Sequence, residues 1–224
     1  MSIILNIDSS IETASVSIAK DGVIIDVIKN PIQKEHAGFL QPAIKELLAK
    51  SSLDLKQMDA IAVTIGPGSY TGLRVGLASA KGLCYALNKP LITIGTLNAL
   101  ALAAIHEIRE NIQGYTLICP MIDARRMEVY TAVFDTEMKE ILPPCAMILN
   151  SNTFGDMLKN NNILFVGNGS LKWSRLIESK SISTLNEIDM TIALGYLSYN
   201  RYLNRDFTDL TYSEPLYVKD FFSA

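Results

Sequence analysis

The chain has 224 residues, of which 49% are hydrophobic and 19% charged, and its formal net charge is −3. This composition supplies a sizeable core and excludes a disordered chain, and the absence of excess positive charge excludes a broad surface for nucleic acid. Three cysteines, Cys84, Cys119 and Cys145, lie too far apart for a zinc or disulfide pattern, and the absence of a signal peptide and of a membrane-length apolar run predicts a cytoplasmic protein without a membrane span.

The first elements are predicted to form an antiparallel meander of three strands. Ile3–Ile7 is a short apolar run that is followed by Asp8. Thr13–Ala19 alternates between apolar residues and serines, which is typical of a half-buried strand. Asp21-Gly22 is a strong hairpin signal, so Val23–Ile28 is expected to return beside the second strand.

Helices and strands alternate after the meander. Lys34–Lys50 has one apolar face and predicts a helix, although Pro42 should kink or delay it. The elements expected next are the strand Ile61–Ile65, a helix ending at Leu87, the strand Leu91–Ile94 and a helix from Thr96 towards Glu107. This order predicts an α/β lobe in which helices cover a mixed sheet.

The strand pattern restarts in the second half of the chain. Met121–Ile141 lines up with Asn6–Ile25, since each contains an apolar strand closing on an aspartate, a polar turn, an alternating strand and a return strand. The two aspartates are Asp8 and Asp123. Ile163–Ser170 adds a strand that meets another glycine turn. The repeat predicts two similar lobes with a cleft between them.

Ile61–Leu83 raises the question of phosphate binding, because a strand, a glycine turn and a helix can form a phosphate cradle. The Walker pattern is absent, since no Gly-Lys-Ser/Thr follows Gly66 or Gly68. The dinucleotide pattern also fails, because Gly72 comes one place late and the next strand ends in Gly95-Thr96 without an acid. We therefore expect these glycines to serve packing.

The helix after this turn has a face of small residues, on which Gly72, Gly76, Ser79 and Leu83 recur at steps of four and three. A separate apolar face suffices to pack the helix on a sheet. An interior glycine costs about 1 kcal/mol relative to alanine, so close packing must offset this cost. The small face is expected to meet either a neighbouring helix of the same lobe or another subunit.

Four motifs resemble the TsaB family, also called YeaZ, which is the dimerisation subunit of the bacterial machinery that makes threonylcarbamoyladenosine in tRNA. These motifs are IDSSIETASVSI (Ile7–Ile18), GPGSYTGLRVGLASAKGL (Gly66–Leu83), IDARRMEVYTAVF (Ile122–Phe134) and EPLYV (Glu214–Val218). The resemblance implies the two-lobed fold of the actin, sugar-kinase and heat-shock ATPase superfamily, a duplicated ribonuclease H-like α/β fold with mixed sheets. We expect one lobe over residues 1–110 and a smaller, less regular lobe over residues 111–224.

The resemblance also implies partners. The family pairs with a TsaD-type catalytic paralogue through its first two helices, packed as a bundle, and a TsaE-type ATPase joins the wider complex. A homodimer through the same face is an alternative, since a surface suited to a paralogue can also meet its own copy. The partner-interface residues predicted in this way are Leu40, Ile44, Leu47, Gly72, Gly76, Ser79 and Leu83.

No catalytic or metal-binding residue is expected in this chain. In the catalytic paralogue, two histidines bind the metal, and the corresponding positions here are Thr96 and Leu100. The two histidines of this chain, His36 and His106, are far apart. His36 is expected to have a surface or a capping role, and His106 is expected at the surface near a helix end.

A residual nucleotide site is the remaining question about chemistry. The phosphate-binding turns of the superfamily correspond to Asp8-Ser9-Ser10 and Asp123-Ala124-Arg125, so Asp8, Ser9 and Asp123 are candidate ligands of magnesium and phosphate. No further acidic residue is clearly placed to act as a general base. Gly167-Asn168-Gly169 could merely form the turn from a strand into a helix. Both aspartates are therefore expected to cap backbone amides. No cofactor is required by the chain, and Mg-ATP is assigned to the complex.

The resemblance and the residues together predict a non-catalytic scaffold that pairs with TsaD. The complex would support threonylcarbamoyl transfer to the adenosine beside the anticodon of tRNAs that read codons beginning with A. Arg125-Arg126 is expected to be a solvated turn, so tRNA contact would run through the complex. Two alternatives stay open: an ATP-dependent kinase or ATPase of the same superfamily, and a self-contained homodimeric module.

Overall fold

The computed structural model describes residues 1–32, 35–109, 114–176, 183–185 and 187–219. The chain divides into two compact units, which we describe separately. Unit 1 contains Met1–Thr96 and Thr191–Leu216, and unit 2 contains Leu97–Met190 and the residues from Tyr217 onward. This grouping differs from the expected division at residue 110, because unit 2 already begins at Leu97 and the chain returns to unit 1 at Thr191.

Unit 1 is built on a mixed five-stranded sheet in the order β3-β2-β1-β4-β5. The central strand β1 pairs antiparallel with β2 and parallel with β4. The strands are β1 (Ile3–Asp8), β2 (Ala14–Lys20), β3 (Val23–Asn30), β4 (Ala60–Gly66) and β5 (Leu91–Gly95). The predicted meander and the two strands that follow it are confirmed.

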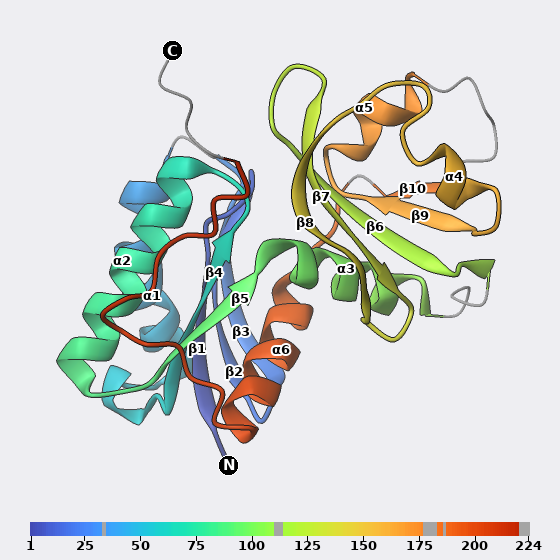
Figure 1. Cartoon of the computed structure of the whole chain (residues 1–224). Coiled ribbons are helices and arrows are strands. Elements are labelled where there is room, and N and C mark those ends of the chain that lie inside the picture. Colours follow the sequence, from blue (N-terminus) through green and yellow to red (C-terminus); the bar gives the residue numbers. More distant parts are fainter. Residues whose placement is uncertain (33–34, 110–113, 177–182, 186, 220–224) are drawn as a thin grey trace. The chain divides into compact units, whose positions relative to one another are not determined.

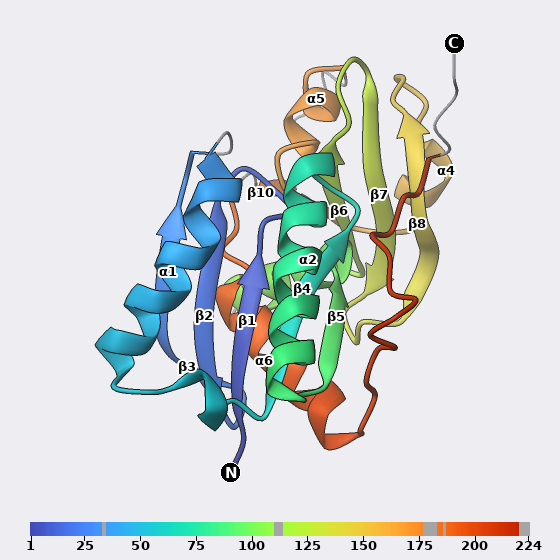
Figure 2. The ribbon, with the colours of Figure 1, turned by 90° about the vertical axis from the view of Figure 1, so that its left-hand side faces the viewer.

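Two helices, α1 (His36–Ser51) and α2 (Tyr70–Leu87), lie side by side on one face of this sheet (Figure 2). A short 3-10 helix, η2 (Leu55–Gln57), precedes β4. Pro42 lies inside α1, which runs unbroken through it. None of the described helices combines the length and the apolar character that crossing a membrane requires.

The other face of the sheet is covered by α6 (Thr191–Leu203), a helix that the sequence analysis did not predict (Figure 1). Its backbone comes close at Gly195, where a methyl group would lie 2.7 Å from the Cδ1 atom of Ile24. Ser15 and Ser17 of β2 are consequently buried. The prediction that this strand is half-buried is therefore wrong, because α6 covers its serine side.

Unit 2 repeats the same topology. Its mixed sheet has the order β10-β9-β6-β7-β8, in which β6, β7, β8, β9 and β10 take the places of β1 to β5. The strands are β6 (Leu117–Asp123), β7 (Glu128–Asp135), β8 (Glu140–Ile148), β9 (Ile163–Val166) and β10 (Ser183–Leu185). The predicted duplication and fold class are confirmed.

The helices of unit 2 are α3 (Thr96–Glu107), α4 (Gly155–Leu158) and α5 (Ser170–Ser174). The counterparts of the long helices α1 and α2 are thus very short, with 4 residues in α4 and 5 in α5. Three aromatic rings fill the core beneath them, with the Phe154 ring edge-on to those of Phe165 and Trp173. The reduced second lobe expected from the sequence is present.

Candidate functional site

The predicted interface residues of α1 lie inside unit 1. Leu40 and Leu47 have no exposed surface, and Ile44 is 3% exposed. All three belong to the hydrophobic cluster that α1 forms with the sheet. Their side chains pack α1 against its own sheet. The prediction that these three residues contact a partner is therefore corrected.

The predicted interface glycines of α2 are also internal. A methyl group at Gly72 would overlap the carbonyl oxygen of Ser9, and one at Gly76 would lie 2.5 Å from Ser9 Oγ. The Ser9 hydroxyl donates a hydrogen bond to the Gly72 carbonyl at 2.8 Å. These glycines therefore bring the loop after β1 onto α2, and this part of the small face meets the chain's own backbone.

The exposed side of α2 is nevertheless lined with small residues. We define the outer face of α2 as Thr71, Val75, Ala78, Gly82 and Ala86, which follow one another at steps of four and three. Val75 is half-buried and the other four are exposed. A methyl group at Gly82 would have no neighbour within 4 Å. An interior glycine that no internal contact requires costs the helix about 1 kcal/mol.

Ser79 and Leu83 are half-buried and border this outer face, so two of the seven predicted residues keep a place beside it. Tyr85 lies on its other border and is 83% exposed. On the same side, the Lys81 ammonium donates to the carbonyl oxygens of Thr211 and Ser213, at 3.2 and 3.1 Å, and fixes that segment beside α2. The sequence-based interface did not include Val75, Ala78 or Gly82. The sequence shows a glycine inside the helix at position 82, but only the structure shows that no internal contact requires it.

The first candidate nucleotide turn, Asp8-Ser9-Ser10, is closed by hydrogen bonds of its own. Asp8 Oδ1 accepts from the Ser10 amide at 3.0 Å, from Ser10 Oγ at 2.7 Å and from Thr64 Oγ1 at 2.7 Å. Burial raises the pKa of Asp8 above its ordinary value, against the opposing effect of these hydrogen bonds. The carboxyl group therefore fixes the loop against β4.

His36 supports the same region from inside. The side chain is 3% exposed, and its Nε2 atom lies 3.0 Å from the carbonyl oxygen of Glu12. The expectation of a surface histidine is wrong here, because the first turn of α1 packs over the loop that follows β1.

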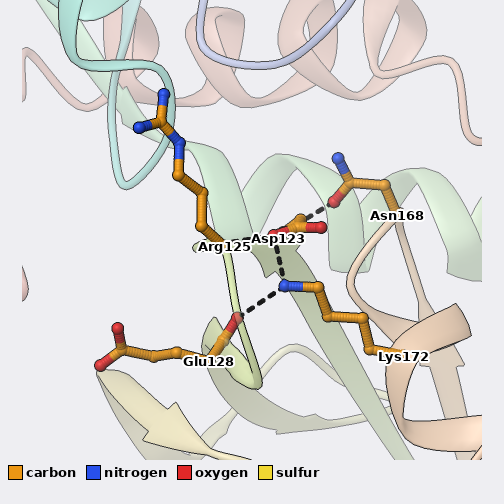
Figure 3. A network of polar contacts seen from close by, with 5 residues as sticks. All are labelled: Asp123, Arg125, Glu128, Asn168 and Lys172. Carbon is orange, nitrogen blue, oxygen red and sulfur yellow. Dashed lines mark hydrogen bonds and ion pairs between the residues drawn. The ribbon is translucent and has the colours of Figure 1, made fainter.

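The second candidate turn is held by an ion pair (Figure 3). The Lys172 ammonium lies 2.5 Å from Asp123 Oδ1 and also donates to the Glu128 carbonyl at 3.3 Å. The Arg125 amide donates to Asp123 Oδ1 at 2.5 Å, and the Asp123 amide donates to Asn168 Oδ1 at 2.8 Å. Figure 3 shows the Arg125 side chain pointing away from this carboxylate. Asp123 thus already has a cation from its own unit.

We expect Lys172→Ala to lower the free energy of unfolding by no more than about 1 kcal/mol, because partly exposed ion pairs contribute little. Lys172 and Asp123 retain 19% and 38% of their side-chain exposure. The difference should shrink at high salt, which screens the pair. Urea unfolding followed by the fluorescence of Trp173, the single tryptophan, measures it, with the exposed Arg175→Ala as matched control. A loss of several kcal/mol would contradict this assignment.

A metal-binding cluster and an activated cysteine are two kinds of reactive centre for which the described residues can be compared. Within the described ranges, no group of three or more histidine, cysteine or acidic side chains is gathered as a metal site. Burial raises the pKa of the Cys84 and Cys119 thiols to about 12, so neither is a thiolate nucleophile at neutral pH. The residual nucleotide site at Asp8, Ser9 and Asp123 stays a prediction.

Comparison with known proteins identifies the family. Residues 23–213 match the family described as TsaD: tRNA N6-adenosine threonylcarbamoyltransferase. The chain is 30% identical to the tRNA threonylcarbamoyladenosine biosynthesis protein TsaB of Haemophilus influenzae, over 97% of this chain and 93% of that protein. It is also 30% identical to the protein of the same name from Bacillus subtilis, over 78% of this chain and 75% of that one.

The solved structure of YeaZ from Pseudomonas aeruginosa superimposes with a TM-score of 0.79 at 24% identity, covering 97% of this chain and all of that one. This likeness shows that the two proteins share a fold. The sequence matches along nearly the whole chain agree with it. The family model described as TsaD also covers TsaB-type chains such as this one, and this chain belongs to the TsaB family.

Proposed function

We propose that this chain is the pairing subunit of a complex that makes threonylcarbamoyladenosine in tRNA. In this proposal it binds a TsaD-type catalytic paralogue, and the pair supports threonylcarbamoyl transfer to the adenosine beside the anticodon of tRNAs that read codons beginning with A. The names of its relatives support the pathway, and its match to the TsaD description supports a paralogous partner. Such a complex acts on tRNA in the cytoplasm.

The outer face of α2 carries the pairing in this proposal. Its small exposed side chains allow the backbone of a second helix to approach closely, and the space beside Gly82, where a methyl group would lie, has no neighbour within 4 Å. The exposed side of α1 that lies towards α2, away from β3, extends the surface. This placement replaces the buried residues of the sequence-based prediction while keeping the same pair of helices.

We assign no catalytic step to this chain. Its two candidate carboxylates already bind groups of their own units. Asp8 accepts hydrogen bonds from Ser10 and Thr64, and Asp123 forms an ion pair with Lys172. Catalysis, Mg-ATP and the contacts with tRNA then belong to the partner proteins, including a TsaE-type ATPase. A formal charge of −3 supports an indirect role in tRNA binding.

Gly82→Leu is expected to weaken pairing with the TsaD homologue of the same organism by about 100-fold or more, because a bulky side chain at the centre of a close helix contact keeps the backbones apart. The isolated variant should remain folded, since leucine favours a helix more than glycine does by about 1 kcal/mol. Isothermal titration calorimetry measures the affinity, and size-exclusion chromatography with light scattering measures the mass of the pair.

Arg126→Glu is the matched control, because Arg126 is exposed in a turn of unit 2 and should leave pairing unchanged. Unchanged affinity in Gly82→Leu would reject the outer face of α2 as the interface. Absence of any complex with the wild-type chain would reject the pairing function itself. A wild-type dimer that Gly82→Leu converts to monomer, and that the paralogue cannot exchange with, would favour the homodimeric module.

A further inference from the structure

We propose that the open edge of β3, together with the groove between β3 and α1, is a docking site for an extended basic segment of another protein. The segment would add to the sheet as a further strand. This site goes beyond the pairing function, because it uses the β3 side of α1 and leaves the outer face of α2 free.

The two edge strands of the sheet in unit 1, β5 and β3, differ in whether another segment pairs with them. At β5, Thr208 forms a bridge with Leu91, and its amide donates to the Leu91 carbonyl at 2.8 Å. At β3, the described residues of unit 1 supply no strand on the side away from β2. Val23 and Ile25 of this edge are 67% and 47% exposed. An open edge with exposed apolar side chains is a template for pairing with another chain.

A groove of about 380 Å³ runs beside this edge. Its described lining residues are Ile28, Asn30, Glu35, Gly38, Phe39, Pro42, Ala43 and Glu46. Figure 2 shows α1, which carries most of them, lying beside the β3 edge of the sheet. Apolar groups thus form the larger part of the groove, and the edge strand forms one of its sides.

The charges of the groove specify the occupant. Glu35 and Glu46 are exposed, and no lysine or arginine is among the described lining residues. The Glu35 carboxylate accepts a hydrogen bond from Asn30 Nδ2 at 3.2 Å, and this neutral amide does not cancel its charge. An occupant with cationic side chains would complement both carboxylates and would associate faster for that reason.

Strand addition explains how backbone and side chains would both be recognised. Main-chain hydrogen bonds to β3 provide affinity, and every second side chain of the added strand projects to the α1 side, into the groove. A suitable segment therefore carries an apolar residue between two cations at alternate positions.

A second copy of this chain fits the groove less well. Beyond its irregularity near Ile25, β3 presents Asp26, Ile28 and Asn30 on the α1 side, as the contact of Asp26 with Lys50 of α1 indicates. These residues bring no cation to Glu35 or Glu46. We therefore assign the groove to another protein.

The test uses three fluorescein-labelled hexapeptides and measures fluorescence anisotropy with the full chain. The first carries lysine, leucine and lysine at alternate positions with threonines between them. The second replaces both lysines by glutamate. The third replaces the threonine after the leucine by proline, which removes a backbone N–H donor and disfavours strand pairing. We expect the first peptide to bind at least about tenfold more tightly than either of the others.

Variants of the chain separate this site from the pairing surface. The double variant Glu35→Lys and Glu46→Lys should weaken the lysine peptide at least about tenfold, whereas Glu137→Lys, an exposed charge reversal in unit 2, should not. Gly82→Leu should bind the peptide normally, so failure of TsaD pairing and failure of this proposal are distinguishable. Equal binding of all three peptides, or an unaffected double variant, would overturn the proposal. So would self-association of the wild-type chain that Val23→Lys abolishes.

Discussion

Gly72→Ala is expected to lower the free energy of unfolding of the isolated chain by about 3 kcal/mol, at the upper end of the usual cost of overpacking. The added methyl group would overlap the Ser9 carbonyl oxygen, which belongs to a buried loop and cannot simply swing away. For a chain of this length, the loss corresponds to a decrease in melting temperature of roughly 6–12 °C.

Gly82→Ala is the matched control, because it adds the same methyl group to the same helix at a position with no neighbour within 4 Å. It should instead raise the free energy of unfolding by about 1 kcal/mol. Circular dichroism follows both units, whereas Trp173 fluorescence follows unit 2. The Gly72→Ala effect should therefore appear mainly in circular dichroism. Equal stabilities of the two variants would contradict the contact between α2 and the loop after β1.

Asp8→Ala is expected to lower the free energy of unfolding by about 3 kcal/mol, because it leaves buried donors without an acceptor at about 1–3 kcal/mol each. The donors concerned are the Ser10 amide, Ser10 Oγ and Thr64 Oγ1. Asp8→Asn keeps the accepting Oδ1 atom and removes the charge, so it should retain most of the stability. If both variants were as stable as the wild type, Asp8 would have no structural role and the nucleotide interpretation would gain weight.

The pH dependence of stability, compared between Asp8→Asn and the wild type, provides a second measurement. Burial raises the pKa of Asp8 in the folded state above the unfolded value of 3.8. The stabilising contribution of the protonated form is therefore fully present below the unfolded pKa and is lost as the pH rises through the folded pKa. The stability of Asp8→Asn relative to the wild type should accordingly be highest at neutral pH and decrease as the pH falls towards 4. An increase on acidification would indicate the opposite pKa shift.

Local patterns predicted the elements whose residues carry their own signals. The alternation of Thr13–Ala19 and the Asp21-Gly22 turn predicted β2, the hairpin and β3, and the repeat around Asp123 predicted the second sheet. The helix α6 was missed because it carries apolar residues on two sides: Leu194 is buried on the sheet and Ile192 is 63% exposed. Apart from Leu194, its buried residues are small or polar, namely Thr191, Ala193, Gly195 and Ser198, so its buried face lacks the large apolar side chains that a sequence pattern would reveal.

Five of the seven predicted interface residues are buried inside unit 1, and sequence reasoning misplaced them for a different reason. The small residues of α2 serve two neighbours, and sequence spacing alone cannot say which face meets which neighbour. Gly72 and Gly76 are small because Ser9, more than 60 residues earlier in the chain, lies against them, and this contact exists only after the sheet has formed. Gly82 has no such neighbour, so only the folded chain shows that its small size is available to a partner.

The discontinuity of unit 1 has a consequence for synthesis on the ribosome. Its first part ends at Thr96, but the segment that closes it begins at Thr191. Until α6 has emerged, one side of the sheet, including Ser15 and Ser17, lacks the helix that buries it. Nearly all of unit 2, from Leu97 to Met190, leaves the ribosome in this interval. The order of synthesis thus allows unit 2 to fold before unit 1 is closed, and leaves one face of the unit 1 sheet uncovered during this interval.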